Sequence, residues 1–257
     1  MTPRALILTL TLWSAWSTVP ELMETTAEAA TVTYQISGTP GFTGAQPVSA
    51  TAQFTTSTNQ IVVVITNNEE NPNTDAQTIN AIIFNISTTP TSSLTASSTT
   101  GSAQDTRTFT KGNTTPTIGS GATTQWATSN SGATLTIGSM SPGTLTRNPH
   151  DHTLIGLGLN GGNTYPNANP SIDSSSHSPF LGFTATFTIV VPGVTSATTV
   201  TSATFEMGTI AGQDATGVIF VSSPEPPTLA LGGIGLASLA AFRALRRGKA
   251  RVVRPST

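Results

Sequence analysis

The sequence predicts an all-β protein whose main part is an antiparallel β-sandwich with Greek-key or jelly-roll-like connections. Thr, which suits the pleated surface of a strand, is abundant, and Gly, Asn and Ser supply turn residues along the chain. Apolar residues gather in short runs separated by polar turns, a pattern typical of many short strands. One N-terminal signal helix and one C-terminal transmembrane helix complete the expected fold.

Residues 1–30 are predicted to be a signal peptide. Arg4 precedes the apolar run 5–19, the pattern of a secretory signal. Ala27-Glu28-Ala29 offers the small-x-small pattern of a cleavage site. We therefore expect export by the Sec machinery and removal of this segment. An earlier cut after Ser17 and a retained N-terminal membrane anchor are the alternatives.

Residues 31–222 are predicted to form the β-sandwich ectodomain. Val32, Tyr34 and Ile36 alternate with polar residues, as in a half-buried strand, and residues 61–65 form an unbroken apolar run that indicates a strand buried on both faces. Residues 67–77 and 139–178 are expected to be loops, and the second holds all three histidines. The strands expected in order are 32–36, 48–54, 60–66, 78–87, 180–191, 200–207 and 217–221, with weaker patterns at 106–110, 123–128 and 134–137.

The composition excludes several classes of function. The chain has no cysteine, so disulfides and thiol catalysis are excluded. Between residues 31 and 223 three basic and eight acidic residues give a net charge of −5, although the whole chain carries only −2. Such a surface lacks the basic patch that nucleic-acid binding requires, so no nucleic acid is expected as a partner.

The last 35 residues, 223–257, have the pattern of a membrane-sorting tail. Residues 228–245 are rich in Leu, Ala and Gly and carry no charge apart from Arg243, and as a helix they would extend about 27 Å, close to the thickness of a hydrocarbon core. A buried core helix is the alternative interpretation of this run. A basic cluster follows, and the positive-inside rule places it on the cytoplasmic side. The cluster consists of Arg243, Arg246, Arg247 and Lys249.

The segment before the apolar run is Pro224-Glu225-Pro226-Pro227, a rigid and extended entry. This motif, the apolar helix and the basic end, in that order at the C-terminus, resemble the sorting signal of PEP-CTERM proteins of Gram-negative bacteria. The resemblance implies processing by an exosortase, a membrane-embedded enzyme, with Pro224, Glu225 and Pro226 as the recognised motif. Pro227 departs from the family pattern, which more often has a small polar residue there. The ectodomain resembles others of the family only loosely, and no functional residue is transferred from it.

Among the short motifs of the chain, the triplet His150-Asp151-His152 has the side chains best suited to a metal or catalytic site. In an extended segment the two imidazoles would point to one face and could bind a metal ion with Asp173 or His177. A polar loop is the alternative, because Asn148-Pro149 is a turn signal. Glu69, Glu70 and Asp75 offer oxygen ligands for Ca²⁺, but their spacing is not that of an EF-hand and a solvated loop is preferred.

Three other features have ordinary explanations. The run 174–178 places serines beside His177 without any nucleophile-elbow motif, and the glycine-rich run 156–162 lacks the lysine and helix of a phosphate loop. Asn85 and Asn113 fit the glycosylation pattern, which arises often by chance in a Thr-rich chain. Trp126 is expected to pack in the core, and a sugar-stacking role is its alternative.

These observations favour an exported surface protein with a structural or adhesive role in an exopolysaccharide matrix, rather than an enzyme. No cofactor is expected. The expected partners are the Sec machinery, an exosortase, the membrane before processing, and exopolysaccharide. The alternatives are a carbohydrate-binding module with an exposed aromatic platform, and a secreted metal-dependent enzyme built around His150, His152 and Asp173.

Overall fold

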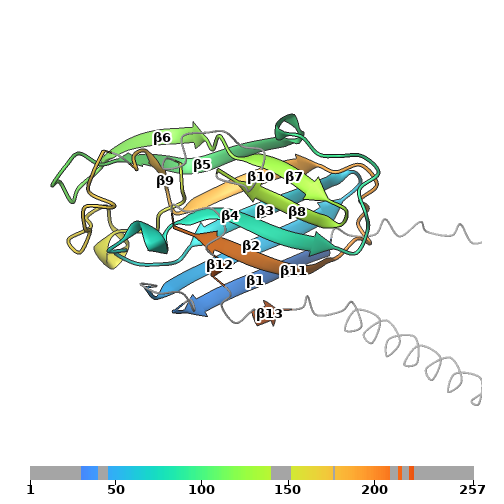
Figure 1. Cartoon of the computed structure of the whole chain (residues 1–257), viewed down its shortest axis with the longest axis horizontal. Coiled ribbons are helices and arrows are strands. Elements are labelled where there is room, and N and C mark those ends of the chain that lie inside the picture. Colours follow the sequence, from blue (N-terminus) through green and yellow to red (C-terminus); the bar gives the residue numbers. More distant parts are fainter. Residues whose placement is uncertain are drawn as a thin grey trace, which may run out of the picture.

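The computed structural model describes residues 30–39, 46–139, 152–175, 177–208, 214–215 and 220–222. Within these residues the chain forms antiparallel strands in two sheets that face each other, with three short 3-10 turns and no α-helix (Figure 1). The prediction of an all-β, largely antiparallel sandwich is therefore confirmed.

The larger sheet has eight described strands. Seven of them lie side by side, and the eighth, β9, pairs with the far half of β5. Their order is β13 (Phe220–Ser222), β1 (Ala30–Gly38), β2 (Val48–Ser57), β3 (Gln60–Asn67), β10 (Thr184–Val190), β5 (Thr99–Thr108) and β6 (Thr117–Thr123), with β9 spanning Phe180–Leu181.

The smaller sheet has five described strands and lies in front of the larger one in Figure 1. The short turns are η1 (Asp75–Gln77), η2 (Ala96–Ser98) and η3 (Leu159–Gly161). The strand order is β12 (Asp214–Ala215), β11 (Val200–Met207), β4 (Ile79–Ile86), β8 (Thr134–Gly138) and β7 (Ala127–Ser131).

The main core lies between the two sheets. Phe54 on β2 contacts Phe84 on β4, with ring centroids 4.8 Å apart. The Tyr34 hydroxyl on β1 donates a 2.7 Å hydrogen bond to the Val200 carbonyl on β11. Burial of apolar side chains such as Phe54 and Phe84 is the main force that holds the two sheets together.

The chain passes repeatedly between the sheets. It leaves the larger sheet after β3 to form β4, and again after β10 to form β11. Because β10 pairs antiparallel with β3 and β11 pairs antiparallel with β4, these two crossings lie at opposite ends of the sandwich. Strands far apart in the sequence are thereby brought together.

A second, smaller core lies under the irregular residues 152–175. Phe109, Ile155, Tyr165, Ile172 and Phe180 are buried in it. The Phe109 ring contacts the rings of Tyr165 and Phe180 at 5.2 and 5.7 Å. The predicted loop is thus fixed to the end of the larger sheet by its own apolar side chains.

Three sequence predictions about strands were wrong. The segment 180–191 is not one strand, since β9 ends at Leu181 and β10 begins at Thr184. The run Ile61–Ile65 is not buried on both faces, because Val62 and Val64 are only partly covered and point to the outer side of the larger sheet. The segment 123–128 is not one strand, since β6 ends at Thr123 and β7 begins at Ala127. The predicted strand at 106–110 is the end of a longer strand, β5.

The predicted signal helix and the sorting tail lie outside the described residues. No helix in the described part of the chain is long and apolar enough to cross a membrane.

Candidate functional site

The outer side of the larger sheet carries a set of fourteen side chains, ten of them hydroxyl-bearing, which we call the hydroxyl face. Its residues come from β1, β2, β3, β10 and β5, and none of them is charged. They are all partly or fully exposed. The hydroxyl face consists of Thr31, Thr33, Gln35, Thr51, Gln53, Thr55, Val62, Val64, Thr66, Thr184, Thr186, Thr188, Thr100 and Ser102.

The sheet register sets these side chains in rows. Thr31 lies opposite Thr55, and their hydroxyl oxygens are 3.2 Å apart. Thr66 and Thr184 form the same kind of pair at 3.2 Å. Neighbouring strands are about 4.8 Å apart and alternate residues about 7 Å apart, so the hydroxyl and methyl groups repeat in two directions.

A shallow groove of about 220 Å³ runs along the hydroxyl face between β5 and β10. Thr100, Ser102, Thr186 and Thr188 line it, and the backbone of Gly101 forms part of its floor. A Cβ at Gly101 would lie 2.8 Å from the Phe187 ring on the core side, which explains the glycine. The groove can accept or donate hydrogen bonds but offers no charge.

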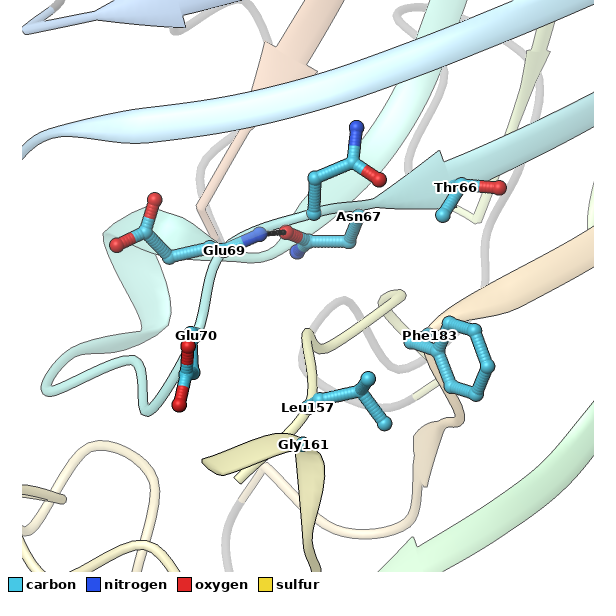
Figure 2. A pocket seen from close by; sticks show the side chains of 8 residues that line it. Thr66, Asn67, Glu69, Glu70, Leu157, Gly161 and Phe183 are labelled. Carbon is cyan, nitrogen blue, oxygen red and sulfur yellow. Dashed lines mark hydrogen bonds between the residues drawn. The ribbon is translucent and has the colours of Figure 1, made fainter. Parts of the chain in front are cut away.

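A pocket of about 210 Å³ lies where the end of β3 meets the loop that contains η3 (Figure 2). The Asn67 amide nitrogen donates to the carbonyls of Gln77 and Leu154 at 2.8 and 2.9 Å, and its oxygen accepts from the Glu69 N–H at 3.0 Å. Asn67 therefore holds three segments together. The pocket is lined by Thr66, Asn67, Asn68, Glu69, Glu70, Leu157, Gly161 and Phe183.

The two acids of this pocket do not converge. Figure 2 shows the Glu69 and Glu70 carboxylates pointing apart. A Glu70 carboxylate oxygen accepts a hydrogen bond from the Asn160 N–H, and burial raises the pKa of the Glu69 carboxyl. The Asp75 carboxylate accepts a 3.0 Å hydrogen bond from the Thr74 hydroxyl. The three acids considered for Ca²⁺ thus have separate structural surroundings.

A buried charged group lies beside the second core. Arg107 is 1% exposed, and its Nε donates to Asp105 at 3.0 Å. Nη1 donates to the Tyr165 hydroxyl, which in turn donates to the Gly156 carbonyl at 2.8 Å. Burial by itself lowers the pKa of the Arg107 guanidinium, but Asp105 and Tyr165 outweigh it and leave the pKa above its ordinary value. These contacts tie β5 to the loop 152–165.

The sequence-predicted metal residues are not brought together where they are described. His150 lies outside the described residues. The His152 Nε2 is 2.9 Å from the Gln125 side-chain nitrogen, and the Asp173 carbonyl accepts a hydrogen bond from the Gly112 N–H at 3.1 Å. In the part of the chain that the structure describes, no three His, Asp or Glu side chains form a group that could hold a metal ion.

Trp126 is confirmed as a core residue. It is 4% exposed and stacks on Phe187 with ring centroids 4.9 Å apart. Its indole N–H donates to the His152 carbonyl at 2.7 Å. It offers no exposed platform for a sugar ring.

A second polar hollow, of about 320 Å³, is lined by neutral side chains. Asn169 and Asn73 approach through a 2.8 Å backbone hydrogen bond, and the Ser171 hydroxyl accepts from the Asp75 N–H at 2.9 Å. We call this hollow the amide cup. It is lined by Gln46, Asn73, Thr74, Asn167 and Asn169.

The sorting residues Pro224, Glu225 and Pro226 and the basic cluster from Arg243 to Lys249 lie outside the described residues. Comparison of the chain with protein-family models, with curated proteins and with solved structures finds no match.

Sequence reasoning missed the hydroxyl face, the amide cup and the Arg107 contacts. The hydroxyl face has a detectable signal, since Thr occupies alternate positions 184, 186 and 188 and also 31 and 33. The amide cup has none, because its residues are neighbours only through the folding of three loops.

Proposed function

We propose that this protein is an exported surface or exopolysaccharide-matrix component with a structural or adhesive role, and that it acts without catalysis. The observation that carries the proposal is the hydroxyl face. A wide, uncharged array of hydroxyl and methyl groups is suited to weak contacts with a neutral, hydroxylated polymer. Weak contacts repeated over many copies hold a matrix together.

The sorting part of the proposal rests on the C-terminal sequence. The Pro224-Glu225-Pro226 motif, the apolar run and the basic end support recognition by an exosortase after export by the Sec machinery. The chain would then be held in the cytoplasmic membrane by a C-terminal helix, with strands β1 to β13 outside, until it is cleaved. The proposed fold is a sandwich with Greek-key or jelly-roll-like connections, with a signal helix before it and a transmembrane helix after it.

Intact-mass spectrometry of the mature protein from its native host tests the sorting. We expect a product that lacks the tail beyond residues 224–226 and is recovered from the surface or the medium. Glu225→Ala should retain the tail in the membrane fraction. A full-length tail in the unmutated protein would overturn processing and leave a simple membrane anchor.

A binding assay on purified exopolysaccharide from the same host tests the adhesive role. The variant Thr186→Glu, Thr188→Glu places two charges on the hydroxyl face and should weaken retention by about tenfold or more. The matched control Thr136→Glu, Thr204→Glu places the same charges on the smaller sheet, where these threonines are also partly exposed. Equal retention of all three proteins would overturn the role of the hydroxyl face.

The amide cup favours a second candidate function, a carbohydrate-binding module. Side-chain amides donate and accept hydrogen bonds at once, which suits the hydroxyl groups of a neutral sugar. Saturable binding of an oligosaccharide that is lost in Asn73→Ala and Asn167→Ala, and kept in the Thr186→Glu, Thr188→Glu variant, would favour this candidate.

A further inference from the structure

Among the described strands, β6 lies at the edge of the larger sheet. It pairs with β5 along one side, and no described strand pairs with its other side. Apart from the β5 ladder, the backbone of residues 117–123 makes no hydrogen bond to another described segment. A row of unpaired N–H and C=O groups is a template for another strand.

Within the described residues, this edge also lacks the usual protection against pairing. Residues 117–123 contain no charge and no proline, and each is partly or fully exposed. Ile118 is 40% exposed, which is high for a large apolar side chain. At the corresponding edge of the smaller sheet, η2 packs against β7, and the Asn130 side chain accepts a hydrogen bond from the Leu94 N–H at 2.7 Å. The β6 edge has no such cover among the described residues.

The sequence of β6 is close to a palindrome. It is Thr-Ile-Gly-Ser-Gly-Ala-Thr, and in reverse only Ile118 and Ala122 exchange places. If two copies pair antiparallel about Ser120, Thr117 lies opposite Thr123 of the other copy, and Ile118 lies opposite Ala122. Cross-strand Thr pairs are favourable, and a large residue opposite a small one packs without a clash.

The one irregular position of β6 fits the same register. Gly121 has a left-handed backbone, with φ of 38°. In the pairing of β6 with β5, Ala122 and Ser120 on either side of it have partners on β5, and Gly121 has no assigned partner. In the two-fold pairing Gly121 lies opposite Gly119. Neither glycine has a side chain, so the irregular backbone at Gly121 causes no side-chain clash with the other copy.

We propose that a second copy of this chain pairs antiparallel along β6 and forms a two-fold dimer in which the two larger sheets become one. Residues opposite each other in an antiparallel pair point to the same side of the sheet. The hydroxyl faces of the two copies therefore lie on the same side of the dimer. The interface is isologous and closes at two copies.

Cysteine cross-linking of the full chain in detergent tests the register, because the native sequence contains no cysteine. Ser120→Cys places two thiols across the two-fold axis at a Cα separation of about 5 Å, within the range that a disulfide spans. Under mild oxidation this variant should form a covalent dimer. Ser131→Cys, an exposed serine on β7, is the matched control and should remain uncross-linked.

Sedimentation of the full chain tests the dimer itself. Ser120→Lys places two ammonium groups opposite each other and should shift the protein to monomer, as should Ser120→Glu. A mixture of the two variants should recover the dimer, because opposite charges then face each other. A monomeric unmutated protein, a dimer that survives Ser120→Lys, or equal cross-linking of the two cysteine variants would overturn the proposal. The intact-mass test reads each copy singly, and the retention test compares proteins that share an unmutated β6, so their outcomes are separate from this one.

Discussion

The guanidinium of Arg107 shows how one side chain can join two parts of the fold. It points inward from β5 at a position where a strand would normally place an apolar residue, and it is fully buried. A buried charge is tolerated only when it is paired and hydrogen-bonded. Asp105, Tyr165 and the Gly156 carbonyl provide those partners. The cluster therefore makes the position of the loop 152–165 depend on β5.

Removal of one partner should be costly. Arg107→Leu leaves Asp105 without its cation and should lower the free energy of unfolding by about 3–5 kcal/mol. The double variant Asp105→Leu, Arg107→Leu should recover much of that loss, because no lone charge remains buried. Urea unfolding of the three proteins measures both values. An Arg107→Leu protein as stable as the unmutated one would show that the ion pair is dispensable.

Glu69 gives a pH-dependent prediction. Burial raises the pKa of its carboxyl above the ordinary value of 4.5, so the folded state holds its proton more tightly than the unfolded state. Stability from this group is therefore present at low pH and is lost as pH rises from the ordinary pKa through the raised one.

Glu69→Gln should remove that contribution. Between about pH 4 and pH 7, rising pH should lower the melting temperature of Glu69→Gln less, or raise it more, than that of the unmutated protein. Glu70→Gln, on the adjacent exposed residue, is the control. An unchanged pH profile in Glu69→Gln would contradict the prediction.

Among the structural elements, the contact between the end of β3 and the loop that contains η3 depends on close backbone approach. A Cβ at Gly156 would lie 1.9 Å from the Glu69 carbonyl oxygen, and backbone atoms cannot move aside as a flexible side chain can. Glu70 forms a parallel bridge with Leu157, and the Asn71 N–H donates to the Leu157 carbonyl at 2.7 Å. Glycine is therefore required at position 156 for packing.

Gly156→Ala should separate these two segments. We expect a loss of about 2–4 kcal/mol in unfolding free energy and faster amide hydrogen exchange in residues 68–71 and 154–158. Thr164→Ala, at an exposed position of the same loop, is the control and should change stability by less than about 0.5 kcal/mol. Unchanged exchange in Gly156→Ala would show that the loop can shift to accept the methyl group.

For the whole molecule, the hydroxyl face and the β6 edge have a joint consequence. If two copies share one sheet, their hydroxyl faces bind the same surface together, and the second contact becomes intramolecular. Ser120→Lys, which leaves the hydroxyl face unchanged, should then lower retention on the exopolysaccharide by about tenfold or more. Retention of the unmutated protein, measured at protein concentrations above and below the dimer dissociation constant, checks this. Equal retention of dimer and monomer would show that one face suffices.

The individual strands differ in how well the sequence predicted them. β11 spans the predicted residues 200–207, and β1 to β4 differ from prediction by a few residues, because each has alternating or continuous apolar residues. The first half of β5 and most of β6 were missed. The core-facing positions of the missed part of β5 hold Gly101 and Ala103, and β6 has a single large apolar residue, Ile118, so no hydrophobic period marks them.

The sequence by itself determined the all-β class and the lack of thiol chemistry, because these follow from residue type and local periodicity. It favoured a core position for Trp126, and the stacking on Phe187 in the structure decided it. Only the tertiary structure decided that Val62 and Val64 point outward, since burial on the second face of a strand depends on what covers it. The hydroxyl face and the amide cup likewise arise from strand order and loop packing. Alternating threonines mark single strands of the hydroxyl face in the sequence, but contacts between distant segments leave no local pattern, so neither the joining of these strands into one face nor the amide cup could be read from the chain alone.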